Sequence, residues 1–305
     1  MRRLFWALAV LAVLAALVLW IVQLPAVQDR LLRSVAEGLV SDQPDELFEP
    51  DALRVLLCGT GSPLPHATRA KACVAVFAGG RFWLVDVGPG SSNRMGLLRV
   101  DLSRVGGVLL THFHSDHIGD LGEWDLNTWV AGRPGPLQVY GPPGVEEVVT
   151  GFEQAYAQDA GYRVAHHGPE LVSPEKGRME ARPLPQAANG PAVVVEDGGL
   201  RITAFPVAHE PVQPAYGYRF DYGGRSVVVS GDTRKDPAMV RAAEGADVLV
   251  HEAQANHMVA LIGEVAGGAG RANVAKIMSD IPSYHTSPVE AAEIANEAGV
   301  GLLAV

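Results

Sequence analysis

The chain opens with an unbroken apolar run and then changes to short apolar stretches separated by glycine, proline and charged residues. Residues 4–22 read LFWALAVLAVLAALVLWIV and contain no polar or charged side chain. At about 1.5 Å of rise per residue, a helix of this length nearly crosses a hydrocarbon core of about 30 Å. The pattern therefore predicts a transmembrane helix at residues 4–22.

This helix is either a membrane anchor or a cleaved secretory signal. Its apolar run is longer than the roughly 7 to 15 residues of a signal-peptide core, and no small-x-small cleavage site follows it. We therefore favour an uncleaved signal anchor. Arg2 and Arg3 favour a cytoplasmic n-region at residues 1–3, although Arg30 and Arg33 weaken this bias. A single pass through the cytoplasmic membrane would then place the main domain on the extracytoplasmic side.

Residues 23–51 predict a juxtamembrane stalk, with a helical pattern in VQDRLLRSVAEGLV followed by the acidic SDQPDELFEPD. Residues 52–305 form the main domain, where short aliphatic and β-branched runs predict strands of a largely buried sheet. The predicted strands are LRVLLCG, ACVAVFAG, RFWLVDVG, VGGVLLTH, AVVVED, LRITAFPVAH, AYGYRFDYG and RSVVVSGD.

Helices are expected between these strands. SSNRMGLLRV and VEEVVTGFEQAYAQ each predict one, and two βα units follow in DPAMVRAAEGADVLVHEA and SPVEAAEIANEAGVGLLAV. Strands packed on both faces by helices imply a layered α/β domain.

Composition narrows the possible functions. The apolar content of 48% is typical of a packed globular core. The formal charge of -10, without a basic run, indicates no positively charged surface that could bind many phosphates. Nucleic acid is therefore an unlikely partner on charge alone. Cys58 and Cys73 are the two cysteines, and we expect free buried thiols, with a single bridge between neighbouring strands as the alternative if the compartment is oxidising.

The stretch THFHSDHIGD, residues 111–120, carries the clearest chemistry in the chain. His112 and His114 lie two apart after the strand VGGVLL, so an extended backbone projects both imidazoles to one side. Asp116 and His117 follow where the chain must bend, and they can face a second ion. Imidazole nitrogen combined with carboxylate oxygen suits zinc, with iron or manganese as alternatives.

At these residues the chain resembles the metallo-β-lactamase superfamily, whose signature is the H-x-H-x-D-H of residues 112–117. Further blocks resemble its tRNase Z-like branch, which also includes arylsulfatase-type and phosphodiesterase-type enzymes. These blocks are LLCGTGSPLP, FWLVDVGPG, AHEPVQPAYGYRF, SGDT, VHEA and HTSPVEAAEIANEAGV. The resemblance covers about residues 53–305 and implies an αββα sandwich of two sheets flanked by helices. Homodimers are common in the branch, so the resemblance also leaves a homodimer open.

The resemblance implies a binuclear zinc site. Its pattern assigns one zinc to His112, His114 and His209, and the second to Asp116 and His117, with Asp232 bridging both. His209 and Asp232 each follow a predicted strand, and strand ends at one edge of a sheet are where α/β sites collect.

The resemblance also implies roles beyond metal binding. Asp116 would orient the attacking water and accept its proton, and His285 would donate a proton to the leaving group. Asp86 would hold an imidazole of the histidine loop from behind, and Glu252 would hydrogen-bond His285.

Two departures from the family pattern bear on activity. The family has HST where this chain has His285-Thr286-Ser287, and a last histidine follows the block that matches VGLLAV. Here the chain ends at Val305. We therefore expect a fragment cut short at its C-terminus, with an incomplete second metal site. His66, His166, His167 and His257 match no ligand of the family.

The sequence favours a membrane-anchored zinc hydrolase of a small phosphodiester or sulfate ester. Residues 142–200 look too short and too acidic to provide the arm with which tRNase Z enzymes hold tRNA, so a tRNase Z-type 3′-end endoribonuclease ranks second. A catalytically weak metal-binding protein of the same fold is the third hypothesis, and only the missing last histidine supports it.

Overall fold

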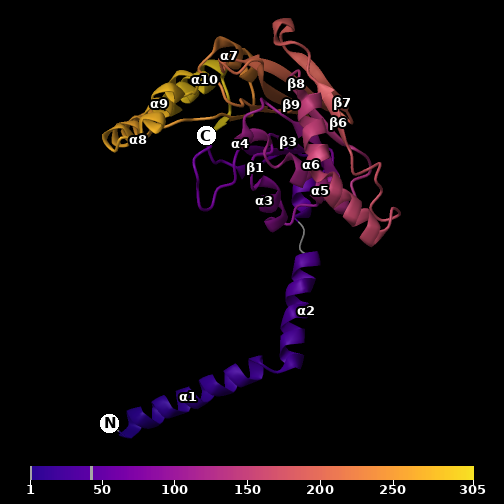
Figure 1. Cartoon of the computed structure of the whole chain (residues 1–305), viewed down its shortest axis with the longest axis vertical. Coiled ribbons are helices and arrows are strands. Elements are labelled where there is room, and N and C mark those ends of the chain that lie inside the picture. Colours follow the sequence, from indigo (N-terminus) through magenta and orange to yellow (C-terminus); the bar gives the residue numbers. More distant parts are fainter. Residues whose placement is uncertain (1, 42–43) are drawn as a thin grey trace. The chain divides into compact units, whose positions relative to one another are not determined.

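The computed structural model describes residues 2–41 and 44–305 and divides into two compact units, Met1–Pro44 and Asp45–Val305 (Figure 1). Met1, in the predicted n-region, and residues 42–43, in the predicted stalk, lie outside the described residues. The first unit consists of α1 (Arg2–Val22) and α2 (Pro25–Ser41). By length and composition α1 is able to cross a membrane. Pro25 begins α2 because its ring pre-sets the helical φ and its missing N–H is not needed at a first turn.

The second unit contains two six-stranded sheets. The first runs in the order β1 to β6: β1 (Arg54–Gly59), β2 (Cys73–Ala78), β3 (Arg81–Val85), β4 (Val105–Leu109), β5 (Leu137–Gly141) and β6 (Met179–Pro183). The second runs from β12 to β7: β12 (Leu302–Ala304), β11 (Val248–Val250), β10 (Arg225–Val229), β9 (Ala215–Tyr222), β8 (Leu200–Val207) and β7 (Ala192–Asp197). Neighbouring strands are parallel from β3 to β6 and from β10 to β12, and the other neighbours are antiparallel.

Alternation along the strands explains the layers. In β3, Phe82 and Leu84 pack toward the helices, whereas Trp83 and Val85 pack between the two sheets. Both faces of the strand are buried, which is why RFWLVDVG is almost continuously apolar rather than alternating.

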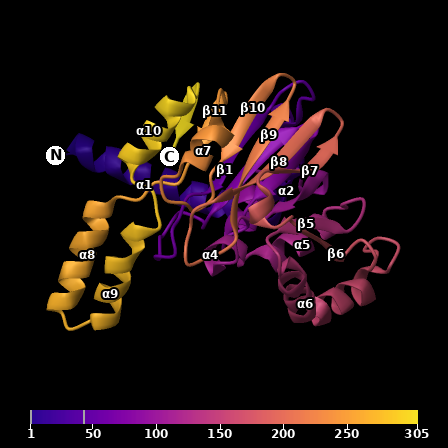
Figure 2. The same ribbon diagram turned by 90° about the horizontal axis from the view of Figure 1, so that it is seen from above.

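Helices cover the outer face of each sheet (Figures 1 and 2). On the first sheet these are α3 (Ser91–Leu97), α5 (Leu121–Val130) and α6 (Val145–His167); on the second they are α7 (Pro237–Ala243) and α10 (Pro288–Ala298). Met95 and Trp124 pack on the first sheet, and Met239 and Ile294 on the second. The αββα sandwich expected from the sequence is confirmed.

Short elements and one helical pair complete the unit. The short elements are η1 (Asp45–Phe48), η2 (Leu102–Arg104), α4 (Ser115–Ile118), η3 (Ala187–Asn189) and η4 (Ile281–Ser283). The pair α8 (Asn256–Gly268) and α9 (Ala272–Asp280) forms a hairpin that projects from the sandwich in Figure 2. The sequence pattern predicted no element in this region.

The expectation of free cysteines is wrong, because Cys58 and Cys73 form a disulfide. β1 and β2 pair antiparallel, but their register shifts between Leu57 and Gly59. Cys58 is the extra residue of this bulge, and its Cα lies 5.1 Å from that of Cys73, within the range a disulfide spans. A bulge cannot be read from apolar periodicity, so the bridge between neighbouring strands was ranked below free thiols.

We expect the disulfide to stabilise the sandwich. Replacing both Cys58 and Cys73 with serine should lower the free energy of unfolding by about 2–4 kcal/mol, because the unfolded chain loses a cross-link. Thermal denaturation with and without dithiothreitol measures this. The reductant should lower the melting temperature of the natural chain and leave the double variant unchanged; equal melting temperatures for all samples would contradict the prediction.

Candidate metal centre

Most of the predicted site residues follow the carboxyl ends of strands; His285 instead lies between η4 and α10. Asp86 follows β3, and His112 follows β4 by way of Leu110 and Thr111. In the second sheet His209 follows β8, Asp232 follows β10 and Glu252 follows β11. Strands β8 and β10 point the same way because each is antiparallel to β9, and β11 is parallel to β10, so these residues reach one edge.

The histidine loop bends sharply after β4. His114 is extended, with φ -62° and ψ 146°, and it precedes the single turn of α4 that carries Asp116 and His117. The extended segment places His112 and His114 side by side, with His112 Nε2 2.9 Å from His114 Nδ1. The turn then brings His117 back over His112, with ring centroids 4.1 Å apart.

Contacts between the sheets fix this loop against the second half of the site. The Tyr218 hydroxyl donates to the Leu110 carbonyl at 2.7 Å, and the Tyr216 N–H donates to the Thr111 carbonyl at 3.0 Å. Gly231, just before Asp232, has φ +63°, and a Cβ there would lie 2.9 Å from Thr111 Cγ2. Glycine therefore allows Asp232 to approach the histidine loop.

Three imidazoles and one carboxylate converge where the two halves meet. His112, His114, His209 and Asp232 each offer a donor atom, and these atoms all lie within 4.8 Å of one another. His209 Nε2 is buried and has no hydrogen-bond partner among the described residues. Burial lowers the pKa of His112 to about 2 and also lowers that of His209, so both keep a free lone pair at neutral pH. This donor set fits a divalent metal ion.

A second group shares Asp232. His117 Nε2 lies 3.3 Å from Asp232 Oδ2 and 3.7 Å from Asp116 Oδ2. Burial lowers the pKa of His117, but Asp232 and Asp86 outweigh burial and raise this pKa well above its usual value. The neighbouring carboxylates thus favour a positive charge at this point, which a second cation would supply.

Asp86 holds the histidine loop from behind. Its carboxylate accepts the Thr111 N–H and the Thr111 hydroxyl, each at 2.8 Å, and lies 2.7 Å from His117 Nδ1. Asp86 is 3% exposed and has φ +60°, a left-handed conformation that is uncommon outside glycine. A hydrogen bond at Nδ1 turns His117 Nε2 toward Asp116 and Asp232.

His285 and Glu252 form a pair beside this cluster. His285 Nδ1 lies 2.9 Å from both carboxylate oxygens of Glu252 and 4.0 Å from Asp232 Oδ2. Burial raises the pKa of Glu252 to about 7. Burial alone would lower the pKa of His285, but the contact with Glu252 outweighs it and raises this pKa. The pair therefore holds a proton near neutral pH.

Two positioning residues were missed by the sequence analysis. Thr111 hydrogen-bonds Asp86, and its Oγ1 also lies 3.0 Å from His112 Nδ1. The Tyr284 carbonyl lies 3.1 Å from His209 Nδ1 and so directs Nε2 of that ring into the cluster. A polar residue that closes an apolar strand could have pointed to Thr111, whereas a backbone carbonyl leaves no signal in the sequence.

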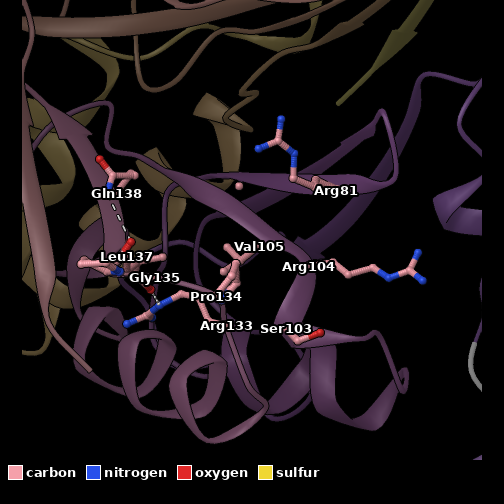
Figure 3. A pocket seen from close by; sticks show the side chains of 11 residues that line it. Arg81, Ser103, Arg104, Val105, Arg133, Pro134, Gly135, Leu137 and Gln138 are labelled. Carbon is pink, nitrogen blue, oxygen red and sulfur yellow. Dashed lines mark hydrogen bonds between the residues drawn. The ribbon is translucent and has the colours of Figure 1, made fainter. Parts of the chain in front are cut away.

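A separate cavity lies at the opposite edge of the first sheet (Figure 3). It has a volume of about 420 Å³ and is lined by residues at the starts of β3, β4 and β5, such as Arg81, Val105 and Leu137. In Figure 3 the guanidinium groups of Arg81, Arg104 and Arg133 point in different directions. Arg133 already donates to Asp125 at 2.8 Å. This cavity holds none of the predicted site residues.

Comparison with known proteins agrees with this geometry. Residues 81–305 match the beta-lactamase superfamily domain. The chain belongs to this superfamily. A relative named ribonuclease Z, from Mycobacterium bovis strain BCG / Pasteur 1173P2, is 39% identical over 254 residues, which cover 82% of this chain and 84% of the relative. The tRNase Z-like branch expected from the motifs is thereby confirmed.

Solved structures of the superfamily share the fold. The metallo-β-lactamase fold protein YhfI from Bacillus subtilis aligns with a TM-score of 0.58 at 22% identity, over 82% of this chain and 84% of that one. The short form of human tRNase Z aligns with the same TM-score at 21% identity, over 82% of this chain and 91% of that one.

These relatives overturn the ranking of functions made from the sequence. A membrane-anchored hydrolase of small phosphodiesters or sulfate esters was placed first, and nucleic acid was considered an unlikely partner; the ribonuclease Z relatives favour the second hypothesis instead. The charge argument used the net charge of the whole chain, which does not describe one local site. Nothing in the comparisons supports arylsulfatase-like activity.

We expect Asp86→Asn to weaken metal binding about 10- to 100-fold, because the variant loses the charge that orients His117. Competition with a chromogenic chelator measures the affinity. Asp197→Asn, which removes the exposed partner of Arg81, is the matched control and should bind metal normally. Equal affinities of the two variants would show that Asp86 does not position the loop.

Proposed function

We propose that this superfamily member is a metal-dependent RNA phosphodiester hydrolase of the ribonuclease Z type, which cuts tRNA precursors at their 3′ end in vitro. The observation that carries the proposal is the extent of the likeness. The relatives named ribonuclease Z align with 254 residues, and the second unit runs from Asp45 to Val305. The family match at residues 81–305 includes every residue of the cluster.

We further propose zinc as the metal, because imidazole nitrogen with carboxylate oxygen suits that ion. His112, His114 and His209 would hold one ion, Asp116 and His117 the other, and Asp232 both. When bound, the ions would supply a hydroxide-like water at neutral pH and would neutralise the phosphate oxygens. The convergence of these side chains supports the assignment.

In this proposal Asp116 orients the attacking water and accepts its proton. The Asp116 carboxylate is buried and lies 3.7 Å from His117 Nε2, beside the second group of ligands. A carboxylate there accepts the proton as the water oxygen bonds to phosphorus.

His285 is proposed to protonate the leaving ribose oxygen as its bond to phosphorus breaks. The contact with Glu252 supports this role, because it keeps a proton on the pair near neutral pH. Glu252 is itself fixed, since its Oε1 accepts the Thr233 N–H at 2.7 Å. Glu252 therefore acts as a positioning residue for His285.

Pre-tRNA cleavage tests the proposed function. The full chain in detergent should release a 3′ trailer from a radiolabelled pre-tRNA, and a chelator should abolish cleavage until zinc is restored. His285→Ala should lower kcat by about 10²- to 10⁴-fold with little change in metal content, because it removes a proton donor.

His257→Ala is the matched control, because His257 is exposed on α8 and outside the cluster. It should cleave as fast as the natural chain. Full metal loading without any RNA cleavage would refute the nuclease proposal and support a metal-binding protein of the same fold. Cleavage that is unaffected by His285→Ala would refute only the role of that residue.

We also propose that α1 anchors the chain in the cytoplasmic membrane with the catalytic unit on the extracytoplasmic side. Arg2 and Arg3 support this orientation, and so does the Cys58–Cys73 disulfide, because disulfides persist in oxidising compartments. In this orientation the RNA that the enzyme meets lies outside the cytoplasm. Pre-tRNA cleavage in vitro then reports the chemistry of the site rather than its substrate in the cell.

Orientation is measured with a single reporter cysteine. Leu171→Cys places a free thiol at a side chain that is 75% exposed, and the two natural cysteines are paired. A membrane-impermeant maleimide should label this variant in intact cells whose outer envelope is permeable to the reagent. Labelling that requires lysis of the cytoplasmic membrane would place the unit in the cytoplasm.

A further inference from the structure

The hairpin of α8 and α9 carries an uncovered apolar stripe. Met258, Leu261, Ile262 and Val265 are 56%, 59%, 40% and 64% exposed. Their spacing of three, four and seven positions places them on one face of α8. We call these four residues the α8 stripe.

The α8 stripe is not part of the core of the hairpin. The opposite face of α8 packs on α9, where a Cβ on Gly263 would lie 3.1 Å from Met278 Cβ and Ala266 is buried. The main contacts of α8 are with α9 and η4, and Figure 2 shows the hairpin projecting away from the sheets. A helix that is apolar on both faces is normally buried on both, so a further partner is expected to pack on the α8 stripe.

We propose that the α8 stripe docks on the surface of a phospholipid bilayer. The chain itself brings a bilayer within reach, because α1 is able to span one. α2 has 17 residues, which is about 26 Å of helix, and residues 42–44 complete the connection to the catalytic unit. So short a tether keeps the hairpin at a high effective concentration near the membrane.

Charge also favours lipid over RNA. Residues 256–280 contain Glu264 and Asp280 against Arg271 and Lys276, so the hairpin is neutral in a chain of net charge -10. The hairpin is therefore not repelled by an anionic lipid surface in the way that the rest of the acidic chain is. Nucleic acid would need cations along the stripe, and the stripe has none.

The size of the stripe argues against a second copy as its cover. Four side chains that are only about half exposed fall well short of the roughly 800 Å² per partner of a stable protein interface. A tethered lipid contact needs less area, because α1 supplies most of the membrane affinity.

Docking has a consequence for the site. α9 leads through η4 to Tyr284, whose carbonyl faces His209, and to His285. A hairpin held on lipid therefore holds the segment that positions these two histidines close to the membrane surface. The inference rests on α1 lying in the membrane and not on the nature of the substrate.

The test uses the full chain in vesicles of phosphatidylcholine and phosphatidylglycerol. Because the two natural cysteines are paired, Leu261→Cys provides a single thiol for an environment-sensitive nitrobenzoxadiazole label. Leu171→Cys is the control, since it is exposed in the same unit but far from the hairpin in sequence. We expect a blue shift and quenching by nitroxide lipid at position 261 and neither at position 171.

A second pair of variants checks the stripe itself. Val265→Asp, added to the labelled Leu261→Cys chain, should abolish the quenching, because it places a charge in the stripe. Ala272→Asp, at an exposed position in the first turn of α9 and outside the stripe, adds the same charge and should preserve the quenching.

Three results would overturn the proposal. Equal quenching at positions 261 and 171 would show that the stripe does not touch lipid. A blue shift at position 261 that grows with protein concentration at fixed lipid, without nitroxide quenching, would assign the stripe to a second copy. A cross-link between two copies through position 261 would do the same. If the chain fails to enter the vesicles, α1 does not anchor it and the docking proposal fails. RNA cleavage by the same chain in detergent would still test the nuclease proposal separately.

Discussion

The site depends on one buried carboxylate that is held in a strained backbone conformation. Asp86 turns out of β3 with φ +60° and receives two hydrogen bonds from Thr111 and one contact from His117. These contacts fix the direction of the chain as it leaves β4, and hence the directions of the imidazoles that follow. A left-handed aspartate costs free energy of about 1 kcal/mol or more, so its retention implies that several contacts determine it together.

Much of the sandwich follows from the sequence because its strands are buried on both faces. RFWLVDVG and VGGVLLTH are short apolar runs that each lead to a polar residue near their end. The run predicts the strand, and the polar residue marks the edge of the sheet where the site lies. The H-x-H-x-D-H motif likewise sets its own geometry, since two residues of extended chain and one helical turn suffice to bring its side chains together. His209 and Asp232 were assigned from the family resemblance, and their position after recognisable strands agreed with it.

The features that were missed depend on contacts distant in sequence or on the backbone. The bulge that carries Cys58 is a matter of register between two strands, and register has no trace in the apolar pattern of one strand. The Tyr284 carbonyl acts through an atom that every residue has. The α8–α9 hairpin is rich in alanine, glycine and valine, and the sequence analysis assigned it no element. The choice of substrate was misled by the net charge of the chain and by the short, acidic stretch at residues 142–200, because neither describes the local site.

The two sheets contribute unlike shares to the cluster. His112, His114, Asp116 and His117 come from the first sheet, whereas His209 and Asp232 come from the second. In the proposed assignment each ion takes ligands from both halves, so a bound ion would connect the two sheets. An ion that binds only the folded sandwich also stabilises it. Removal of the metal would therefore lower the free energy of unfolding as well as abolish activity.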